Sequence, residues 1–430
     1  MVYKPPAPAR GAPQEQALAD GETPTRRPRG ARRAAHQATS TLPTRPLRVA
    51  LVTGSYNYIR DGVALTLNRL VAYLLRHGVE VEVFAPVGPK PALEHAGTLV
   101  PVPSIAVPLR PEYRLARGLP AAIRERLITF SPDIVHIATP DFLGHGALKL
   151  AQARGWPVLA SYHTRYDTYL SYYHLTALKP LADGIARRFY GACAEVLAPS
   201  ASMADALVAD GVEAKIRLWP RGVDTARFDP ARRSMAWRDR LGLKPDEIAV
   251  AFVSRLVREK RIEDYAQAVE RASRAGLPVR ALVVGDGPER EALSRRLPGA
   301  IFTGFLTGDD LAVAYASADI FLFPSDTETF GNVTLEAMAS GLPALVADAT
   351  GSRSLVVDGE TGFVAPVGDV ETYVAALTRL VGDKALRQRM GEAGRARSLT
   401  FSWDAAMAIV LDAYQRLSGR APAAASEGRA

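Results

Sequence analysis

Two glutamates eight positions apart, Glu328 and Glu336, flank a Phe-Gly-Asn turn in the second half of the chain. The apolar residues 318–324 are typical of a short buried strand of a parallel sheet, and the apolar positions from Val333 onward predict a helix that ends at Gly341. At the start of a helix the backbone N–H groups lack partners and the helix dipole favours an anion. The pattern therefore predicts a phosphate-binding turn with one carboxylate before the helix and one inside it.

The spacing Glu, seven residues, Glu, with Phe-Gly after the first Glu, resembles the hallmark of a large family of retaining glycosyltransferases with the GT-B architecture. The resemblance covers roughly residues 47–415 and is strongest to GDP-mannose-dependent α-mannosyltransferases and sulfolipid-type glycosyltransferases. It implies an α/β fold in which two Rossmann-like parallel-sheet domains face each other across a cleft, and a nucleotide-diphosphate sugar as donor. It also implies retention of the anomeric configuration, with the leaving phosphate taking the acceptor's proton. Nothing in the sequence resembles paired Asp metal ligands, so no metal ion is expected, and the sugar nucleotide is a co-substrate and not a cofactor.

The resemblance assigns the donor site to the residues around the motif. Glu336 would accept hydrogen bonds from the ribose hydroxyls, and Glu328 would lie near the hydroxyls of the transferred sugar. Two solvent-facing helix carboxylates are the alternative, which is disfavoured because Glu328 precedes the predicted helix. The remaining donor-binding candidates are the turn and first helical residues, whose backbone would touch sugar or phosphate: Phe330, Gly331, Asn332 and Val333.

Arg255 and Lys260 follow the predicted strand 248–254 and match the cations with which relatives hold the donor diphosphate. Cleavage of the sugar–phosphate bond leaves a nucleoside diphosphate with growing negative charge, which two cations can stabilise without a metal. An ordinary basic surface loop is the alternative, since Arg258 and Arg261 lie alongside. The glutamate pair downstream favours the diphosphate interpretation.

The first half contributes two further candidates. His163 follows the predicted strand 158–162 and matches the family's histidine at a strand end, where a neutral imidazole would hydrogen-bond a sugar hydroxyl. A structural hydrogen-bonding role is the alternative for a lone histidine. Gly62 stands where relatives have a Gly-rich turn facing the donor phosphate, but here the turn reads Asp-Gly, so a plain turn remains an alternative.

The acceptor is harder to place. Asn57 and Arg60 lie in the same loop as Gly62 and are candidates for contact with the acceptor or the pyrophosphate. Tyr166 and Tyr169 belong to an aromatic patch behind His163 that would suit an acceptor platform, although helix packing is an equal alternative. The mixed basic and aliphatic stretch 110–126 could meet a membrane surface or be an ordinary amphipathic surface.

Length and composition limit the possible domain organisation of the chain. The 430 residues suit two domains of nearly 200 residues, and no apolar run approaches the roughly 20 residues of a membrane-spanning helix. The first 46 residues carry a net charge of +5 of the formal +8, so the basic balance is poor evidence for nucleic-acid binding. The predicted units are a disordered tail (1–46), an acceptor-side domain (47–222), a nucleotide-sugar domain (223–402), a helix returning to the first domain (403–418) and a second disordered tail (419–430).

The location predicted for the chain is the cytoplasm. The single Cys193 excludes an internal disulfide and a cysteine-based metal site, and no secretory signal follows Arg26-Arg27. The basic arm could lie peripherally on anionic lipid, although a solvated extension or a misassigned start codon explains it more simply.

Alternating strands and helices predict a parallel sheet in each half. In the first half the strand candidates are 47–53, 79–84, 134–137 and 158–162, with helices after Gly62 and over 119–128. In the second half they are 248–254, 279–285, 300–303, 320–323 and 344–347.

The main hypothesis is a retaining hexosyltransferase, with GDP-mannose the first choice of donor and a lipid or lipid-linked saccharide as acceptor. A UDP-sugar-dependent glycolipid or sulfolipid synthase acting on diacylglycerol is the same-fold alternative. A two-domain sugar-nucleotide epimerase or a phosphorylase would share the architecture but lack the glutamate pair beside Arg255 and Lys260. A non-catalytic sugar-nucleotide-binding module would tolerate loss of those residues, and all are present.

Overall fold

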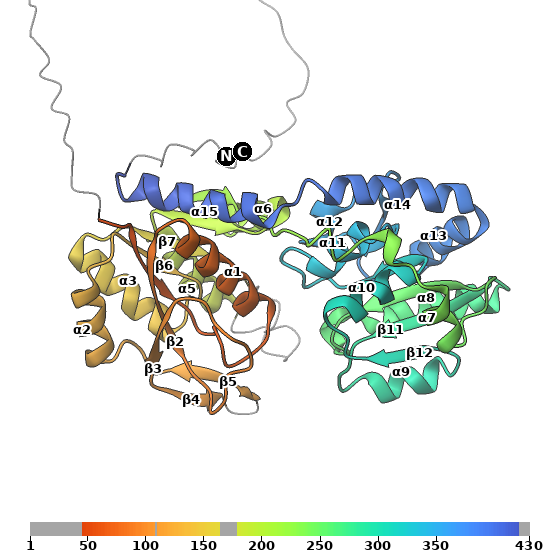
Figure 1. The fold of residues 1–430 in the computed structure, drawn as a ribbon, viewed down its shortest axis with the longest axis horizontal. Coiled ribbons are helices and arrows are strands. Elements are labelled where there is room, and N and C mark those ends of the chain that lie inside the picture. Colours follow the sequence, from red (N-terminus) through yellow and green to blue (C-terminus); the bar gives the residue numbers. More distant parts are fainter. Residues whose placement is uncertain (1–44, 108–109, 164–178, 421–430) are drawn as a thin grey trace, which may run out of the picture.

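The computed structural model describes residues 45–107, 110–163 and 179–420, without the side chains of 110–112, and shows two α/β halves side by side (Figure 1). The first half contains a seven-stranded parallel sheet in the order β3-β2-β1-β6-β7-β8-β9. Its strands are β1 (Arg48–Val52), β2 (Glu80–Pro86), β3 (Thr98–Val102), β6 (Ile134–Ile137), β7 (Val158–Ser161), β8 (Glu195–Ala198) and β9 (Lys215–Leu218).

Helices bury both faces of this sheet. Alternate residues of β1 point to opposite sides, and Val49 and Leu51 join one apolar cluster while Ala50 and Val52 join the other. The first cluster includes α1 (Gly62–Arg76) and α15 (Trp403–Leu417), and the second includes α2 (Ala121–Phe130), α3 (Phe142–Arg154), α5 (Lys179–Gly191) and α6 (Ala201–Ala209).

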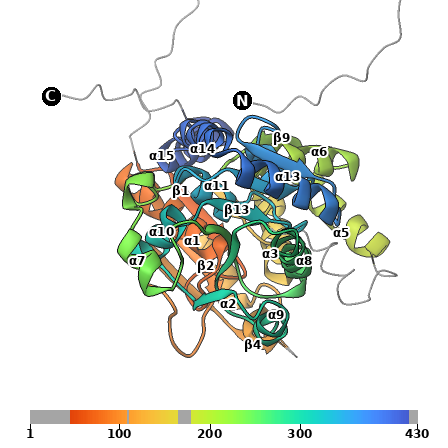
Figure 2. The same cartoon turned by 90° about the vertical axis from the view of Figure 1, so that its right-hand side faces the viewer.

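The second half repeats the scheme around a six-stranded parallel sheet in the order β12-β11-β10-β13-β14-β15. Its strands are β10 (Ile248–Val253), β11 (Val279–Val284), β12 (Ile301–Gly304), β13 (Ile320–Phe323), β14 (Ala344–Ala347) and β15 (Gly362–Ala365). Its helices are α7 (Met235–Arg240), α8 (Ile262–Arg274), α9 (Arg290–Arg296), α10 (Gly308–Ser317), α11 (Asn332–Ala339), α12 (Ser352–Leu355), α13 (Val370–Gly382) and α14 (Lys384–Ser398). Figure 2 views α8, α9 and α14 nearly end-on. The predicted α/β class with two Rossmann-like halves is confirmed.

Two chain crossings join the halves and touch each other. The backbone N–H of Val223 donates to the carbonyl of Phe401 at 3.1 Å. A Cβ atom on Gly222 would lie 2.3 Å from the nitrogen of Trp403, so only glycine permits this approach. Beyond the second crossing, α15 runs back over the N-terminal half, where Met407, Val410 and neighbouring residues join its core (Figure 1).

Several elements differ from the sequence prediction. The stretch 110–126 contains β5 (Arg110–Ala116), an unpredicted strand paired antiparallel with β4 (Ser104–Val107), and then the start of α2, close to the predicted helix 119–128. The strands β3, β8, β9 and β15 were not predicted. Residues 1–44 of the predicted N-terminal tail and 421–430 of the C-terminal tail lie outside the described residues.

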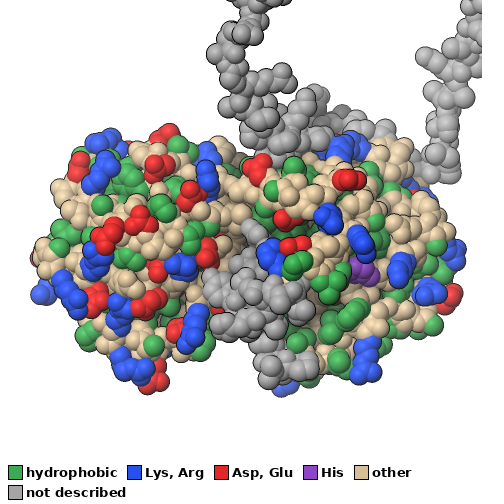
Figure 3. Space-filling model, turned by 180° about the vertical axis from the view of Figure 1, so that it is seen from behind, with side chains coloured by type: hydrophobic (Ala, Val, Ile, Leu, Met, Phe, Trp, Pro, Cys, Tyr) green, Lys and Arg blue, Asp and Glu red, His purple; other side chains and the backbone are tan. Residues whose placement is uncertain are grey.

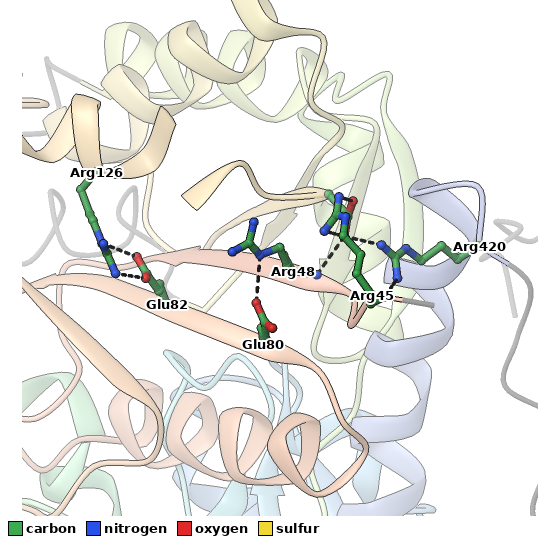
Figure 4. A network of polar contacts seen from close by, with 7 residues as sticks. Arg45, Arg48, Glu80, Glu82, Arg126 and Arg420 are labelled. Atoms are coloured by element: carbon green, nitrogen blue, oxygen red, sulfur yellow. Dashed lines mark hydrogen bonds and ion pairs between the residues drawn. The ribbon is translucent and has the colours of Figure 1, made fainter. Parts of the chain in front are cut away.

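The start and the end of the described chain meet at one carboxylate. Asp133 pairs with Arg45 at 2.6 Å and with Arg420 at 3.0 Å, and it also accepts from the backbone N–H of Arg48 at 2.9 Å (Figure 4). Arg45, assigned to the tail by sequence, therefore contacts the folded body. Arg48–Glu80 and Arg126–Glu82 pairs line the same region. In the described parts of the chain, no helix combines the length and apolar character needed to cross a membrane.

Candidate active site

The candidate site lies at the point in each sheet where the strand order reverses. In the C-terminal half, β10 and β13 are neighbours, and their following loops carry Arg255 with Lys260 and the segment 325–331. In the N-terminal half, β1 holds the corresponding place and is followed by the loop 53–61. Ligands of open parallel sheets bind at this reversal, outside the carboxyl ends of the strands.

The turn between β13 and α11 is held by two close backbone approaches. Gly331 has φ 96°, and a Cβ atom there would lie 2.8 Å from the Ser352 hydroxyl oxygen. A Cβ atom on Gly351 would lie 2.5 Å from the carbonyl oxygen of Glu328. Because both positions require glycine, the path of the backbone N–H groups at the start of α11 is fixed by the fold.

Glu328 and Lys260 form an ion pair, which the sequence did not predict. The Lys260 ammonium lies 2.5 Å from Glu328 Oε1, and the two side chains are 13% and 17% exposed. Ser325 Oγ also donates to Glu328 Oε1 at 3.1 Å, and Lys260 donates to Thr327 Oγ1 at 3.3 Å. The sequence assigned Lys260 to the donor diphosphate and Glu328 to the transferred sugar. In the structure the two side chains pair, and each compensates the other's partly buried charge.

Glu336 lies one turn into α11 with its Oε2 accepting a hydrogen bond from the Tyr315 hydroxyl at 3.2 Å. Burial raises the pKa of Glu336 to about 7, while the Tyr315 hydrogen bond and the positive charge of Arg69 act in the opposite direction. Arg69 comes from α1 in the other half, and its guanidinium lies 4.6 Å from the ring centre of Trp403. Neither Tyr315 nor Arg69 was predicted as a site residue.

Arg255 is exposed, and no ion pair joins it to another of the described residues. Its charge opposes the burial that raises the pKa of Asp61 in the N-terminal half, so Arg255 acts electrostatically on the other half of the chain. Asp61 caps α1 by accepting from the backbone N–H of Ala64 at 2.8 Å. A Cβ atom on Gly62 would lie 3.9 Å from Asn332 Nδ2, so the predicted Gly62 turn faces the start of α11.

The Gly-Asp-Gly turn after β11 supports Arg255. A Cβ atom on Gly285 would lie 1.9 Å from the carbonyl oxygen of Ser254, and one on Gly287 would lie 2.4 Å from that of Leu256. Leu256 also donates its N–H to the carbonyl of Asp286 at 2.9 Å. The glycines make room for the loop that carries Arg255.

Gly285→Ala is expected to lower the free energy of unfolding by about 2 kcal/mol, because the added methyl overlaps backbone that has little freedom to move. Urea unfolding measures this, with Gly276→Ala as the matched control: Gly276 has φ +82° but no atom within 4 Å of its Cβ position. Equal losses in both variants would mean that backbone angle, not the close approach, explains the effect.

His163 lies at the end of β7 with both ring nitrogens engaged inside the N-terminal half. Nε2 is 2.8 Å from Ser161 Oγ, and Nδ1 is 3.2 Å from an Arg221 guanidinium nitrogen. Burial lowers the pKa of His163 well below its ordinary value, and Arg221 adds to this effect. A ring nitrogen could meet a sugar hydroxyl, as expected from the resemblance, only by giving up one of these bonds.

The motif loop also contacts the N-terminal half directly. The Thr329 hydroxyl donates to the carbonyl of His163 at 3.1 Å, and the Ser200 hydroxyl donates to the carbonyl of Thr329 at 2.9 Å. Ser202 Oγ accepts from the backbone N–H of Gly351 at 3.1 Å. These hydroxyls hold the two halves together beside Glu328. Sequence reasoning missed Ser200 and Ser202, whose only signal is a Pro-Ser-Ala-Ser segment after β8.

Of the remaining donor candidates, Phe330 and Val333 have packed apolar side chains, whereas Asn332 has a buried side-chain oxygen. Phe330 is buried and packs edge-on against Phe401, and Val333 packs against the C-terminal core, so a ligand contact by either residue would have to come from its backbone. Asn332 Oδ1 and Thr350 Oγ1 are buried oxygens without a hydrogen-bond partner among the described residues. Such atoms beside the motif fit a site that a polar ligand completes.

Asn57, predicted to contact the acceptor, lines a cavity of about 550 Å³ with residues 91–95. Its side chain is buried, with Nδ2 3.4 Å from the His95 ring and Oδ1 unpartnered among the described residues. Arg60 is exposed in the same loop. Tyr166 and Tyr169 lie outside the described residues, so the aromatic platform stays a prediction. Within the described ranges, no group of three or more His, Cys, Asp or Glu side chains is placed to hold a metal ion.

Comparison with known proteins defines the class. Residues 60–227 match the model of Glycosyltransferase Family 4, and residues 234–397 match that of Glycosyl transferases group 1. The solved structure of sucrose-phosphate synthase from Thermosynechococcus elongatus superposes with a TM-score of 0.72 at 23% identity, covering 87% of this chain and 99% of that one. The fold is therefore that of the GT-B enzymes.

Curated relatives narrow the class further. A GDP-mannose-dependent alpha-mannosyltransferase of Mycobacterium tuberculosis is 35% identical over 87% of this chain and 98% of its own length. Sulfoquinovosyl transferase SQD2 of Arabidopsis thaliana is 34% identical over 84% of this chain and 72% of its own length. The chain belongs to this family of GT-B glycosyltransferases and is a glycosyltransferase.

Proposed function

We propose that this glycosyltransferase moves a hexose from a nucleotide-diphosphate sugar, with GDP-mannose the first candidate, to a lipid or lipid-linked saccharide. The observation that carries the proposal is the Lys260–Glu328 pair, which brings the loops after β10 and β13 together at the strand reversal. The relative from Mycobacterium tuberculosis, whose name states GDP-mannose as donor, supports the choice of donor.

In the proposed reaction the bond between the sugar C1 and the donor's β-phosphate oxygen breaks while the acceptor oxygen bonds to C1 on the same face. The acceptor's hydroxyl proton passes to the departing phosphate, so anomeric configuration is retained and no enzyme nucleophile is needed. Arg255 and Lys260 stabilise the charge that grows on the diphosphate, which is the part a metal ion plays in other transferases. Backbone N–H groups at the start of α11 add to this stabilisation.

Glu328 and Glu336 orient the two ends of the donor. When the diphosphate attracts Lys260, Glu328 Oε1 loses its ammonium partner and becomes free to accept hydrogen bonds from sugar hydroxyls. Glu336 accepts from the ribose, with Tyr315 holding its other lone pairs in place. Positioning of both ends fixes C1 for attack, which is a major part of transferase catalysis.

The N-terminal half supports a lipid-bearing acceptor. Phe142 at the start of α3 and Leu181 on α5 are each 64% exposed, and Ile105 in β4 is 42% exposed. Figure 3 shows hydrophobic side chains between lysine and arginine side chains over this half, the right-hand lobe. Apolar side chains mixed with cations suit the surface of an anionic membrane. We propose peripheral contact there by a cytoplasmic enzyme.

A UDP-sugar donor with a diacylglycerol acceptor is the second candidate. The resemblance to sulfoquinovosyl transferase SQD2, at nearly the same identity as the mannosyltransferase, favours it specifically. The two candidates differ in donor base and sugar, while the use of Arg255, Lys260 and the glutamates would be the same.

A thermal-shift titration of the full chain tests the donor. GDP, UDP and ADP are added in turn with and without EDTA, followed by their common sugars. A ligand at 100 times its Kd adds about 2.7 kcal/mol to the free energy of unfolding, so the preferred base should raise Tm clearly. We expect GDP to do so, unaffected by EDTA. A response to UDP alone would favour the second candidate, and a shift abolished by EDTA would contradict metal independence.

A further inference from the structure

A chain of hydrogen bonds runs from the C-terminal helix to His163 through the core of the N-terminal half. The Tyr414 hydroxyl on α15 lies 2.6 Å from His136 Nδ1, and His136 Nε2 lies 2.8 Å from Ser161 Oγ. Ser161 Oγ lies 2.8 Å from His163 Nε2, and His163 Nδ1 lies 3.2 Å from Arg221 Nη2. His136, Ser161 and Tyr414 are fully buried and Arg221 is 4% exposed.

Arg221 sets the direction of every bond in this chain. A guanidinium only donates, so His163 Nδ1 must accept and His163 Nε2 must carry the proton. That N–H donates to Ser161 Oγ, whose own hydrogen then points to His136 Nε2. Because His136 Nε2 accepts, the ring proton of His136 is on Nδ1, and this N–H donates to the Tyr414 hydroxyl oxygen. One donor at one end therefore selects the tautomers of both histidines.

The surroundings oppose protonation of His163. The charged and titratable groups that face it are Arg221 from the domain crossing and His136 from β6, and both disfavour a positive charge on its ring. Burial lowers the pKa of His136 to about 3. The Trp219 ring meets the His163 ring edge-on, with centres 5.6 Å apart. Arg221 itself stacks 4.3 Å from the Trp219 ring centre, donates to the Trp219 carbonyl at 2.7 Å, and has no carboxylate partner among the described residues.

His163 contacts the donor motif with its main chain. Its carbonyl accepts from Thr329 at 3.1 Å, one residue after Glu328. The ring is thus anchored inside one half while the carbonyl bonds the motif loop of the other half.

We propose that Arg221 is a positioning residue that locks His163 as a neutral, Nε2-protonated imidazole. His163 then supports the Glu328 loop of the other half through its carbonyl, while its neutral ring keeps one fixed orientation. The kinetic consequence rests on the proposed function, but the tautomer does not.

The test is long-range ¹H–¹⁵N NMR of the full chain with ¹⁵N-labelled histidine, from pH 5.5 to 8, with His163→Gln used to assign one of the seven histidines. In the wild type we expect His163 as the Nε2–H tautomer without protonation across this range. Arg221→Met should give mixed tautomers and a titration near the ordinary pKa of about 6.5. Arg221→Lys, which keeps a charged donor, should preserve the wild-type spectrum.

Tyr414→Phe is the matched control at the other end. It removes the last acceptor of the chain but leaves Arg221 in place, so the His163 tautomer should not change. Should Arg221→Met fail to fold, Arg221→Gln replaces it, because an amide can accept as well as donate and so releases the tautomer. A wild-type Nδ1–H tautomer, protonation of wild-type His163 anywhere between pH 5.5 and 8, or equal effects of the Tyr414 and Arg221 changes would overturn the proposal.

Kinetics give a second readout. Relative to the wild type, kcat/KM of Arg221→Met should fall about tenfold between pH 7.5 and 5.5, the effect of one new protonation with a pKa of about 6.5. A constant ratio across that range would contradict a positioning role through the ring. If no tested sugar nucleotide is a donor, the proposed function fails while the NMR result still decides the role of Arg221.

Discussion

Replacing Lys260 with alanine is expected to lower kcat by about 100-fold with a smaller change in KM for the donor. In the proposed reaction Lys260 meets negative charge that develops on the diphosphate during bond cleavage, and loss of one such donor in a partly dry site costs on the order of 10²–10³ in rate. In the structure the Lys260 ammonium pairs with Glu328, so it already lies beside the loop between β13 and α11. Steady-state assays of nucleoside-diphosphate release measure the effect.

Arg258→Ala is the matched control for Lys260. Arg258 is in the same short turn, but its side chain is 85% exposed and pairs with Glu289 at 3.1 Å. Exposed ion pairs contribute little, so kcat should stay within about twofold of the wild type. Lys260→Arg should restore part of the rate, since it keeps the charge. Unchanged kcat in Lys260→Ala would remove Lys260 from the chemistry.

Sequence reasoning placed several short, wholly or largely apolar strands accurately. Residues 134–137, 320–323 and 344–347 were predicted with the bounds that β6, β13 and β14 have. β9 was missed because Lys215 and Arg217 alternate with apolar residues, as on a solvated segment. In the structure Arg217 is 7% exposed and bonds the buried Glu195 at 2.6 Å. That compensation between strands far apart in sequence is not visible in a local pattern.

In the site, too, local sequence patterns predict where residues lie but not which distant segments contact one another. The positions of Glu336 at the start of α11 and of Lys260 after β10 follow from local strand–turn–helix patterns, which the sequence contains. The Glu328–Lys260 pair and the Arg69 charge near Glu336 arise only when distant segments fold together. Roles within the site therefore depend on tertiary contacts, even where the residues themselves were predicted.

Donor affinity should be pH-dependent through Glu336. Burial raises its pKa to about 7, so most of the population carries a neutral carboxyl at pH 6 when no nucleotide is bound. Ribose hydroxyls donate more strongly to the carboxylate than to the acid, so bound nucleotide favours the ionised form and lowers this pKa. The diphosphate of a sugar nucleotide is esterified at both ends and does not titrate in this range, so it is the ligand to measure. Its binding should tighten as pH rises from about 5 to 7, by at most tenfold per unit, and level off above the pKa of the free protein.

Glu336→Ala should raise the donor KM by about 10- to 100-fold with kcat little changed, because ribose contacts are alike in the ground and transition states and charged hydrogen bonds contribute about 1.5–3 kcal/mol. Glu336→Gln separates charge from shape: it fills the same space beside Tyr315 but does not titrate, so its affinity should be weaker and independent of pH. Calorimetric Kd values from pH 5 to 8 measure both variants. A pH slope that persists in Glu336→Gln would show that another group titrates on binding, and Glu336 would then lose its assignment to the ribose.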